Sequence, residues 1–169
     1  MPMVKETIEI RWHGRGGQGA VTASKLLAET ALDEGKYFQG MPDYGAERMG
    51  APIRAFTRIS SQPIKPYCQV TEPDVVVVLD PSLLGVIDVT EGLKEDGMLI
   101  VNTTMSAAEV RSRAGYKGKV YTVDATGIAM EAMGRNLPIP RCLAFWSGLP
   151  GSWPRRALPV SSGPSSEPP

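Results

Sequence analysis

Apolar residues near the amino end of the chain repeat first at every second position and then at every third or fourth. Ile8, Ile10 and Trp12 alternate with polar residues, which is the pattern of a strand with one buried face. From residue 18 to residue 33 the apolar positions follow helical spacing instead, and Gly35 is placed to end that helix. The sequence therefore predicts a strand, a glycine-rich turn and a helix, in that order.

The apolar run between Asp74 and Asp80 has no polar face. Its four consecutive valines predict a central strand that is covered on both sides. Strand-like and helix-like segments alternate around it, which indicates an α/β fold with one open, mostly parallel, Rossmann-like three-layer sheet in a single domain. Further strands are expected at residues 53–59, 98–101 and 120–123, and further helices at 81–87, 90–95, 106–114 and 125–134.

The composition changes after residue 140. Residues 141–169 contain six Pro, six Ser and three Gly and show neither period, so we expect a domain at residues 1–140 followed by an irregular tail. Two explanations of this tail are open. Its composition is typical of a flexible segment. Bulky Trp146 and Trp153 are unusual in such a segment, and a shifted reading frame of its first codons permits an apolar helix, so a frameshift is the alternative.

The charge balance narrows the possible function classes. The 169 residues contain 18 Lys and Arg against 18 Asp and Glu, a balance that provides no long-range field for nucleic acid or an anionic membrane. There is no apolar run of about 20 residues and no secretion signal, so we expect a cytoplasmic protein. Two cysteines, Cys68 and Cys142, and the single His13 are too few soft ligands for a zinc or iron–sulfur site.

Glycines cluster directly after the first predicted strand. Gly14, Gly16 and Gly19 fit the pattern G-x-G-x-x-G between a strand and a helix. Glycine permits positive φ, which we expect at Gly16, and lets backbone amides and a helix amino terminus approach a phosphate or carboxylate. Arg15 can add a forked donor to the same anion. The expected anion-binding residues are Gly14, Arg15, Gly16, Gly17, Gln18 and Gly19.

Two observations limit this interpretation of the glycine loop. A dinucleotide site needs an acid near the end of the second strand to hold the ribose hydroxyls, and residues 36–40 contain none, so ordinary NAD binding is not expected. The glycines also have a purely structural explanation, in which they let the helix and the strand pack closely. The sequence leaves the anion-binding and the packing roles open.

A second glycine-rich stretch, residues 39–52, carries large side chains that a plain loop does not need. Methionine adapts to irregular surfaces, and loops are frequent places of binding. We therefore expect this stretch to contact a partner or to cover a ligand through Tyr44, Glu47, Arg48 and Met49. An ordinary surface connection is the alternative.

Single polar residues end several of the predicted strands. His13, Asp80 and Asn102 fall at the edge where open α/β sheets bind ligands. We expect His13 to be a hydrogen-bonded imidazole that is structural or contacts a ligand or partner, with a catalytic base as the alternative. Asp80 either faces the ligand or, because Pro81 follows it, caps the next helix. Cys68 is expected to be an inert small hydrophobe, and no catalytic or metal-ligating residue is expected on this chain.

Three separate motifs carry a family resemblance when they are taken together. They are residues 10–20 around the glycine loop, residues 45–52, and the strand at 75–80 with the Pro-Ser-Leu that follows it. In this order they resemble the gamma subunit of 2-oxoacid:ferredoxin oxidoreductases, closest to the pyruvate (pyruvate synthase) branch. The resemblance covers residues 7–140 and stops where the composition changes.

The resemblance implies a hetero-oligomeric oxidoreductase of anaerobic metabolism. Such an enzyme cleaves a 2-oxoacid with coenzyme A and gives an acyl-CoA, carbon dioxide and reduced ferredoxin. It implies alpha, beta and delta-type partner subunits, with thiamine diphosphate and iron–sulfur clusters on those subunits, and a gamma subunit that contacts coenzyme A and is not catalytic alone. The alternatives are a gamma-type subunit of a 2-oxoisovalerate, 2-oxoglutarate or indolepyruvate enzyme, and a stand-alone nucleotide-binding oxidoreductase.

Overall fold

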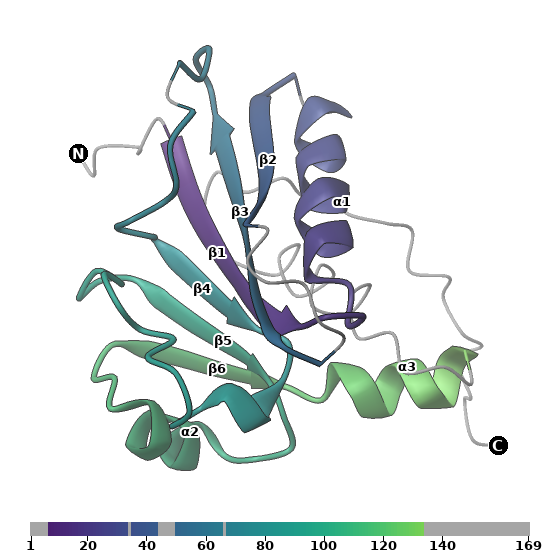
Figure 1. The fold of residues 1–169 in the computed structure, drawn as a ribbon, viewed down its shortest axis with the longest axis vertical. Coiled ribbons are helices and arrows are strands. Elements are labelled where there is room, and N and C mark those ends of the chain that lie inside the picture. The colour runs from purple at the N-terminus through teal and green to yellow at the C-terminus, as the bar shows by residue number, and fades with distance from the viewer. Residues whose placement is uncertain (1–6, 34, 44–49, 66, 134–169) are drawn as a thin grey trace, which may run out of the picture.

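A six-stranded sheet forms the centre of the protein (Figure 1). The computed structural model describes residues 7–33, 35–43, 50–65 and 67–133, so the predicted tail and its boundary at residue 140 lie outside the described residues. The strands are β1 (Thr7–Arg15), β2 (Tyr37–Asp43), β3 (Pro52–Ser60), β4 (Val75–Val78), β5 (Met98–Asn102) and β6 (Lys119–Val123). The helices are α1 (Ala20–Asp33), α2 (Ala107–Ala114) and α3 (Ala125–Met133), and a 3-10 turn, η1, spans Pro81–Leu83.

The sheet combines a parallel part with an antiparallel ribbon. Its strand order is β2-β3-β1-β4-β5-β6, in which β1, β4, β5 and β6 run parallel to one another. β3 pairs antiparallel with both β1 and β2, so the predicted α/β sheet is confirmed but is mixed. The sequence did not predict β2 as a strand of its own, because Gly40 and Pro42 are poor strand formers that an edge strand tolerates.

β4 separates two hydrophobic cores. Val75 and Val77 pack with α1 residues such as Leu27 on one face, and Val76 and Val78 pack on the other face. All four valines are fully buried, which confirms the prediction of a central strand covered on both sides. Alternate side chains of a strand point to opposite faces, so a strand without polar positions requires an apolar layer on each side.

Two of the predicted helices are wrong. Only the first three residues of the segment 81–87 form a helical turn, η1, and residues 90–95 form turns. Gly85 has φ of 83° and Gly92 has φ of 67°, and a left-handed residue ends a helix. The helix predicted at 106–114 is confirmed as α2, which begins at a capping box on Ser106.

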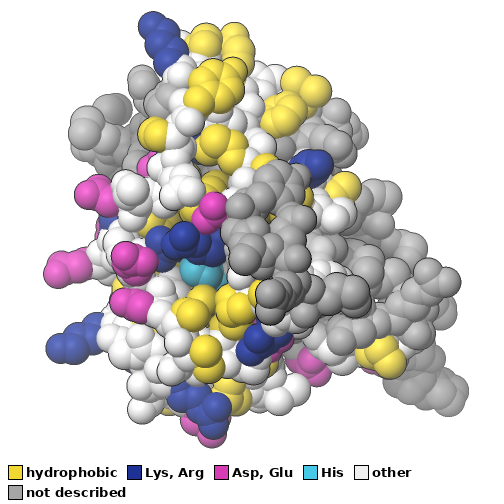
Figure 2. Space-filling view, in the orientation of Figure 1, with side chains coloured by type: hydrophobic (Ala, Val, Ile, Leu, Met, Phe, Trp, Pro, Cys, Tyr) yellow, Lys and Arg dark blue, Asp and Glu magenta, His cyan; other side chains and the backbone are white. Residues whose placement is uncertain are grey.

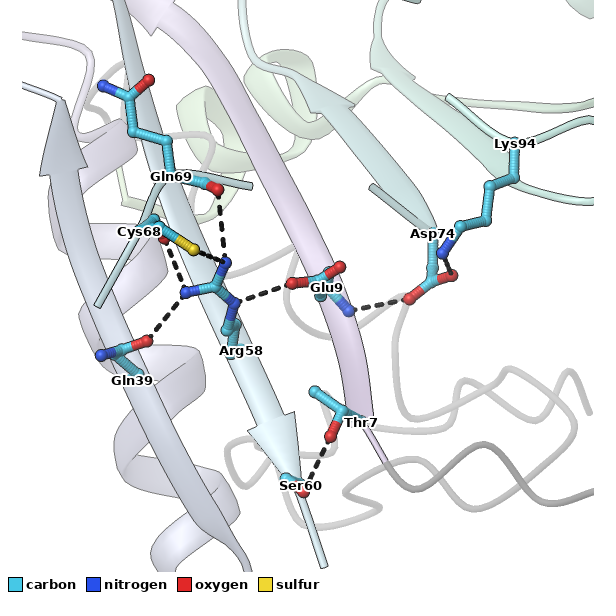
Figure 3. A network of polar contacts seen from close by, with 9 residues as sticks. All are labelled: Thr7, Glu9, Gln39, Arg58, Ser60, Cys68, Gln69, Asp74 and Lys94. Atoms are coloured by element: carbon cyan, nitrogen blue, oxygen red, sulfur yellow. Dashed lines mark hydrogen bonds and ion pairs between the residues drawn. The ribbon is translucent and has the colours of Figure 1, made fainter. Parts of the chain in front are cut away.

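A polar network holds the chain between β3 and β4 against the sheet (Figure 3). Arg58 on β3 is almost fully buried; its Nε lies 2.7 Å from the Glu9 carboxylate, and its Nη1 donates to the carbonyl of Cys68 at 2.7 Å. Asp74, just before β4, accepts from the backbone amide of Glu9 and from Lys94, each at 2.9 Å. Each buried charge in this network therefore has an oppositely charged or hydrogen-bonding partner, as burial requires.

We expect Gly92→Ala to destabilise the fold far more than Gly85→Ala. Both positions have positive φ, which costs an alanine about 1 kcal/mol. At Gly85 an added Cβ would meet nothing within 4 Å, whereas at Gly92 it would collide with the backbone carbonyl oxygen of Thr71. Urea unfolding should show a loss of about 1 kcal/mol for Gly85→Ala and at least about 3 kcal/mol for Gly92→Ala. Equal losses of stability in the two variants would contradict the close approach of Gly92 to the backbone of Thr71.

Candidate functional site

A cleft of about 550 Å³ lies at the carboxyl ends of the parallel strands. The chain leaves β1 toward one face of the sheet, where α1 packs, and leaves β4 toward the other face, where Leu83 of η1 is buried. Open α/β sheets bind ligands in the crevice where successive connections diverge in this way. The residues that line the cleft are Gly17, Gln18, Leu79, Asp80, Pro81, Asn102, Thr103, Thr104, Asp124 and Thr126.

The glycine loop takes a different path from the expected one. Positive φ occurs at Gly17 (92°) and Gly19 (83°), so the expectation of positive φ at Gly16 is wrong. The amide of Gly16 donates to the carbonyl of Ala51 at 3.0 Å, directly after the last paired residues of β1 and β3, Arg15 and Pro52. A Cβ on Gly14 would lie 3.4 Å from the Cβ of the α1 residue Ala20, so close helix–strand packing also uses this glycine.

Arg15 joins the glycine loop to the start of η1. Its Nε lies 3.2 Å from the Asp80 carboxylate, and its Nη2 donates to the Ser82 hydroxyl at 2.9 Å. Its Nη1 donates to the carbonyl of Gly50 at 2.9 Å. The guanidinium remains partly exposed, with 31% of the side chain accessible. An anion that binds Arg15 would therefore compete with acceptors of the protein itself.

Asp80 accepts hydrogen bonds from two directions. The Ser82 amide donates to one carboxylate oxygen at 2.9 Å, and the Gln18 side-chain amide donates to the other at 2.7 Å. Desolvation raises the pKa of Asp80, but the hydrogen bonds from Ser82 and Gln18 and the charge of Arg15 outweigh it and lower the pKa below its ordinary value. Asp80 thus both lines the cleft and caps η1, which unites the two alternatives left open by the sequence.

Asn102 ties together three strand ends at the floor of the cleft. Its side-chain amide donates to the carbonyl of Leu79 at 2.9 Å and to the Thr126 hydroxyl at 2.7 Å. Its oxygen accepts from the Thr126 amide at 3.1 Å. Asp124 lies at the same edge and accepts from the amide of Gly127 at the start of α3. Asp124 and Thr126 were not predicted as site residues, although an acid directly after a predicted strand was the available signal.

His13 lies away from the cleft lining, on the face of β1 opposite to Trp12. It is 2% exposed, and neither ring nitrogen has a hydrogen-bond partner in the described part of the chain. The expected structural hydrogen bond is therefore wrong, and contact with a ligand or partner stays a prediction. Burial first, and then the charges of Arg11 and Arg54, lower the pKa of His13 to about 3 against the weaker opposing charge of Asp88. The ring is neutral at pH 7, and its guanidinium neighbours have no acceptor to offer it.

The remaining residues singled out in the sequence are the expected contact residues after β2 and Cys68. Tyr44, Glu47, Arg48 and Met49 lie outside the described residues, and their role as contacts stays a prediction. Cys68 is exposed rather than packed as a small hydrophobe, and its carbonyl oxygen and its Sγ both accept from the guanidinium of Arg58. Within the described parts of the chain, no three His, Cys, Asp or Glu side chains gather as metal ligands would.

Comparison with known proteins identifies the family of this chain. Residues 9–153 match the family model described as pyruvate ferredoxin/flavodoxin oxidoreductase. The chain belongs to this family. It is 60% identical over 133 residues to the common subunit gamma of the pyruvate/ketoisovalerate oxidoreductases of Thermococcus kodakarensis, with 78% of this chain and 71% of that protein covered. It is 49% identical over 158 residues to the pyruvate synthase subunit PorC of Thermotoga maritima, with 94% and 82% covered.

One solved structure of a relative supports this assignment, and a more distant one shares the fold. The crystal structure of the Thermotoga maritima pyruvate oxidoreductase subunit PORC superposes with a TM-score of 0.76 at 46% identity and covers 92% of this chain and 80% of that one. The 2-oxoglutarate:ferredoxin oxidoreductase of Magnetococcus marinus, solved with coenzyme A bound, shares the fold at 18% identity and a TM-score of 0.58, over 85% of this chain and 24% of that one. The predicted resemblance is confirmed: this is a gamma-type subunit of an oxidoreductase complex. No helix in the described ranges is long and apolar enough to cross a bilayer.

We expect acid to destabilise the chain through His13. The pKa of the imidazole is about 6.5 in the unfolded chain and about 3 in the folded one. Between these pH values the unfolded state binds more protons, so the free energy of unfolding decreases as the pH is lowered. The loss between pH 7 and pH 5 is about 2 kcal/mol. His13→Gln should remove this part of the pH dependence, as measured by urea unfolding at both pH values. The same pH dependence in both proteins would contradict a buried neutral imidazole.

Proposed function

We propose that this chain is the gamma subunit of a cytoplasmic pyruvate:ferredoxin oxidoreductase and that its cleft contacts coenzyme A. In that reaction pyruvate and coenzyme A give acetyl-CoA and carbon dioxide, and two electrons pass to ferredoxin. The observation that supports a ligand contact is the cleft at the diverging connections after β1 and β4, lined by the glycine loop and three further strand ends. The relatives named for pyruvate support the substrate, and the one also named for ketoisovalerate keeps that branched 2-oxoacid as the alternative.

The chemistry of the cleft suits binding rather than bond breaking. Its polar groups are hydroxyls, amides and the carboxylates of Asp80 and Asp124, and Asp80 is fully engaged by Ser82, Gln18 and Arg15. The first amides of α1, beside Gly17 and Gln18, have no partner within the helix and favour an anion such as a phosphate of coenzyme A. We therefore assign to the chain the holding of coenzyme A, and to other subunits the thiamine diphosphate, which supplies the decarboxylation chemistry, and the iron–sulfur clusters.

The assembled enzyme provides the partners in this proposal. Alpha, beta and delta-type subunits would surround the chain, and ferredoxin would dock on the complex rather than on this subunit alone. Tyr44, Glu47, Arg48 and Met49 are proposed to contact those subunits, on the basis of their residue types and spacing. Native mass spectrometry of the purified complex should find this chain together with thiamine-binding subunits. A chain that is always alone and that reduces a nicotinamide unaided would contradict the proposal.

We expect Arg15→Ala to weaken the use of coenzyme A in the reconstituted complex. Removal of a charge-assisted hydrogen bond costs about 1.5–3 kcal/mol, which corresponds to an increase of roughly tenfold or more in the KM for coenzyme A. The KM for pyruvate and the subunit stoichiometry should stay unchanged, as steady-state kinetics and native mass spectrometry would show.

The matched control for this prediction is Arg111→Ala. Arg111 is an exposed arginine on α2, remote from the residues that line the cleft, and its loss should leave both KM values unchanged. An unchanged KM for coenzyme A in Arg15→Ala, with normal assembly, would remove the glycine loop from the binding site.

A further inference from the structure

The buried side-chain nitrogens that lack a hydrogen-bond partner gather at one place. In the described part of the chain they are the Nε of Arg11 and both ring nitrogens of His13. The two residues alternate along β1, so their side chains leave the same face of the sheet, and they are 3% and 2% exposed. An unsatisfied buried polar group carries the full penalty of its lost hydration. Neighbouring side chains that share this cost indicate a place where another group binds.

Elsewhere on this face of the sheet the buried charges are paired. Toward the other end of β1, the charges of Arg58, Glu9, Asp74 and Lys94 form the continuous network of Figure 3. All of these residues have partners at hydrogen-bond distance, and they hold the chain before β4 against the sheet. Unsatisfied nitrogens at Arg11 and His13 are therefore a local property of the carboxyl end of β1 and not a general feature of the face.

Arg54 adds an exposed charge beside the two buried residues. It is the direct cross-strand neighbour of His13, and 43% of its side chain is accessible. Its Nε pairs with Asp43 at 3.1 Å, and within the described ranges no further bond engages its two terminal nitrogens. Figure 2 shows the histidine, coloured cyan, with Lys or Arg side chains directly beside it on this face.

The charged groups around His13 favour an anion. Arg11 on the same strand and Arg54 on β3 act on the imidazole more strongly than Asp88, the carboxylate that faces it from the chain after η1. One oxygen of Asp88 is already bound by the amide and the hydroxyl of Thr90. A carboxylate has two oxygens, enough to accept from the Arg11 Nε–H and from a ring N–H of His13 at once.

We propose that Arg11, His13 and Arg54 form a docking site for a carboxylate side chain of another subunit of the oxidoreductase. This inference rests on the proposed function, which supplies the other subunits. A protein side chain is favoured over a free small acid because these three residues do not line the cleft described above, whereas Figure 2 shows the histidine at the surface of this face. Neither helix α1, which packs on the opposite core, nor α2, which packs against β6, covers the face over β1 and β3. The chain after η1 reaches Arg11 there, through the carbonyls of Val89 and Glu91.

Docking of a carboxylate changes the protonation of His13. Burial is the main cause of the low pKa of His13, ahead of Arg11 and Arg54. A carboxylate in contact with the ring opposes all three, so it raises the pKa of His13 and favours the protonated ring. This proton comes from bulk solvent and remains on the imidazole ring, which then faces the docked carboxylate. Association should therefore tighten as the pH falls from 8 to 6, and it should weaken with added salt.

The test measures how tightly the full chain binds the complex of the remaining subunits. The chain carries an affinity tag without histidine and is titrated onto the immobilised complex by biolayer interferometry. Arg54→Ala should raise the Kd about tenfold, Arg54→Lys less, and Arg111→Ala not at all. His13→Gln should abolish the pH dependence of the Kd. Circular dichroism shows that each variant is folded; because Arg54 is exposed, its variants test the site even if His13→Gln unfolds.

A second measurement distinguishes a partner side chain from a free carboxylate. His13 is the single histidine, so the ring nitrogens of the labelled isolated chain give one unambiguous set of NMR signals. Sodium acetate, compared with sodium chloride at equal ionic strength, should leave these signals in place. Signals that move with acetate, together with normal assembly of Arg54→Ala, would overturn the docking assignment in favour of a small-molecule site.

The outcomes separate this inference from the proposed function. Normal association and normal pH dependence of both Arg54→Ala and His13→Gln would overturn the docking site and leave the coenzyme A contact at Arg15 intact. A wild-type chain that does not bind the other subunits at all would instead overturn the proposed function, and the docking site with it.

Discussion

Burial of β4 on both faces is the constraint on which the rest of the structure depends. Four consecutive valines offer no side that can face water, and each gains about 1.5–3 kcal/mol from burial. The chain must therefore supply an apolar layer above and below this strand. It does so by sending α1 to one face and η1 with α2 to the other. The cleft is the space left where these two paths separate, so its position follows from the packing of a strand that takes no part in binding.

The cleft is held in shape by polar contacts between the elements that form it. Asn102 binds both the end of β4 and the start of α3, while Arg15 and Gln18 both reach Asp80. The positive charge of the glycine loop is thus balanced internally before a ligand arrives. An incoming phosphate exchanges one ion pair for another, so its net gain is smaller than the charge of Arg15 alone suggests. Selectivity then depends on how well a ligand uses the hydroxyls and amides around it.

Local patterns predicted the parts of the fold that local physics decides. The alternation of Ile8, Ile10 and Trp12 and the unbroken valines each define a strand without reference to the rest of the chain. The two wrongly predicted helices contain Gly85 and Gly92. Both glycines are left-handed in the structure, and a sequence pattern does not show which glycines take that conformation. β2 was missed because its stability comes from pairing with β3, which a sequence window does not contain.

The site shows the same division between local and distant causes. The spacing of Gly14, Gly16 and Gly19 placed the loop correctly, but the left-handed residues are Gly17 and Gly19, because pairing with Ala51 fixes Gly16. The environment of His13 was beyond reach for a similar reason: Arg54 comes next to it only through the register of β1 and β3.

The two hydrophobic cores lie on opposite faces of one sheet, so mutations in one core affect the other core little. Val76 and Val77 are joined by a peptide bond, yet their side chains pack with separate sets of neighbours. Substitutions that lie well apart in the two cores share no packing contacts, and the free-energy costs of such independent changes add. One core can therefore be repacked around a new ligand or a new subunit while the other keeps the domain folded.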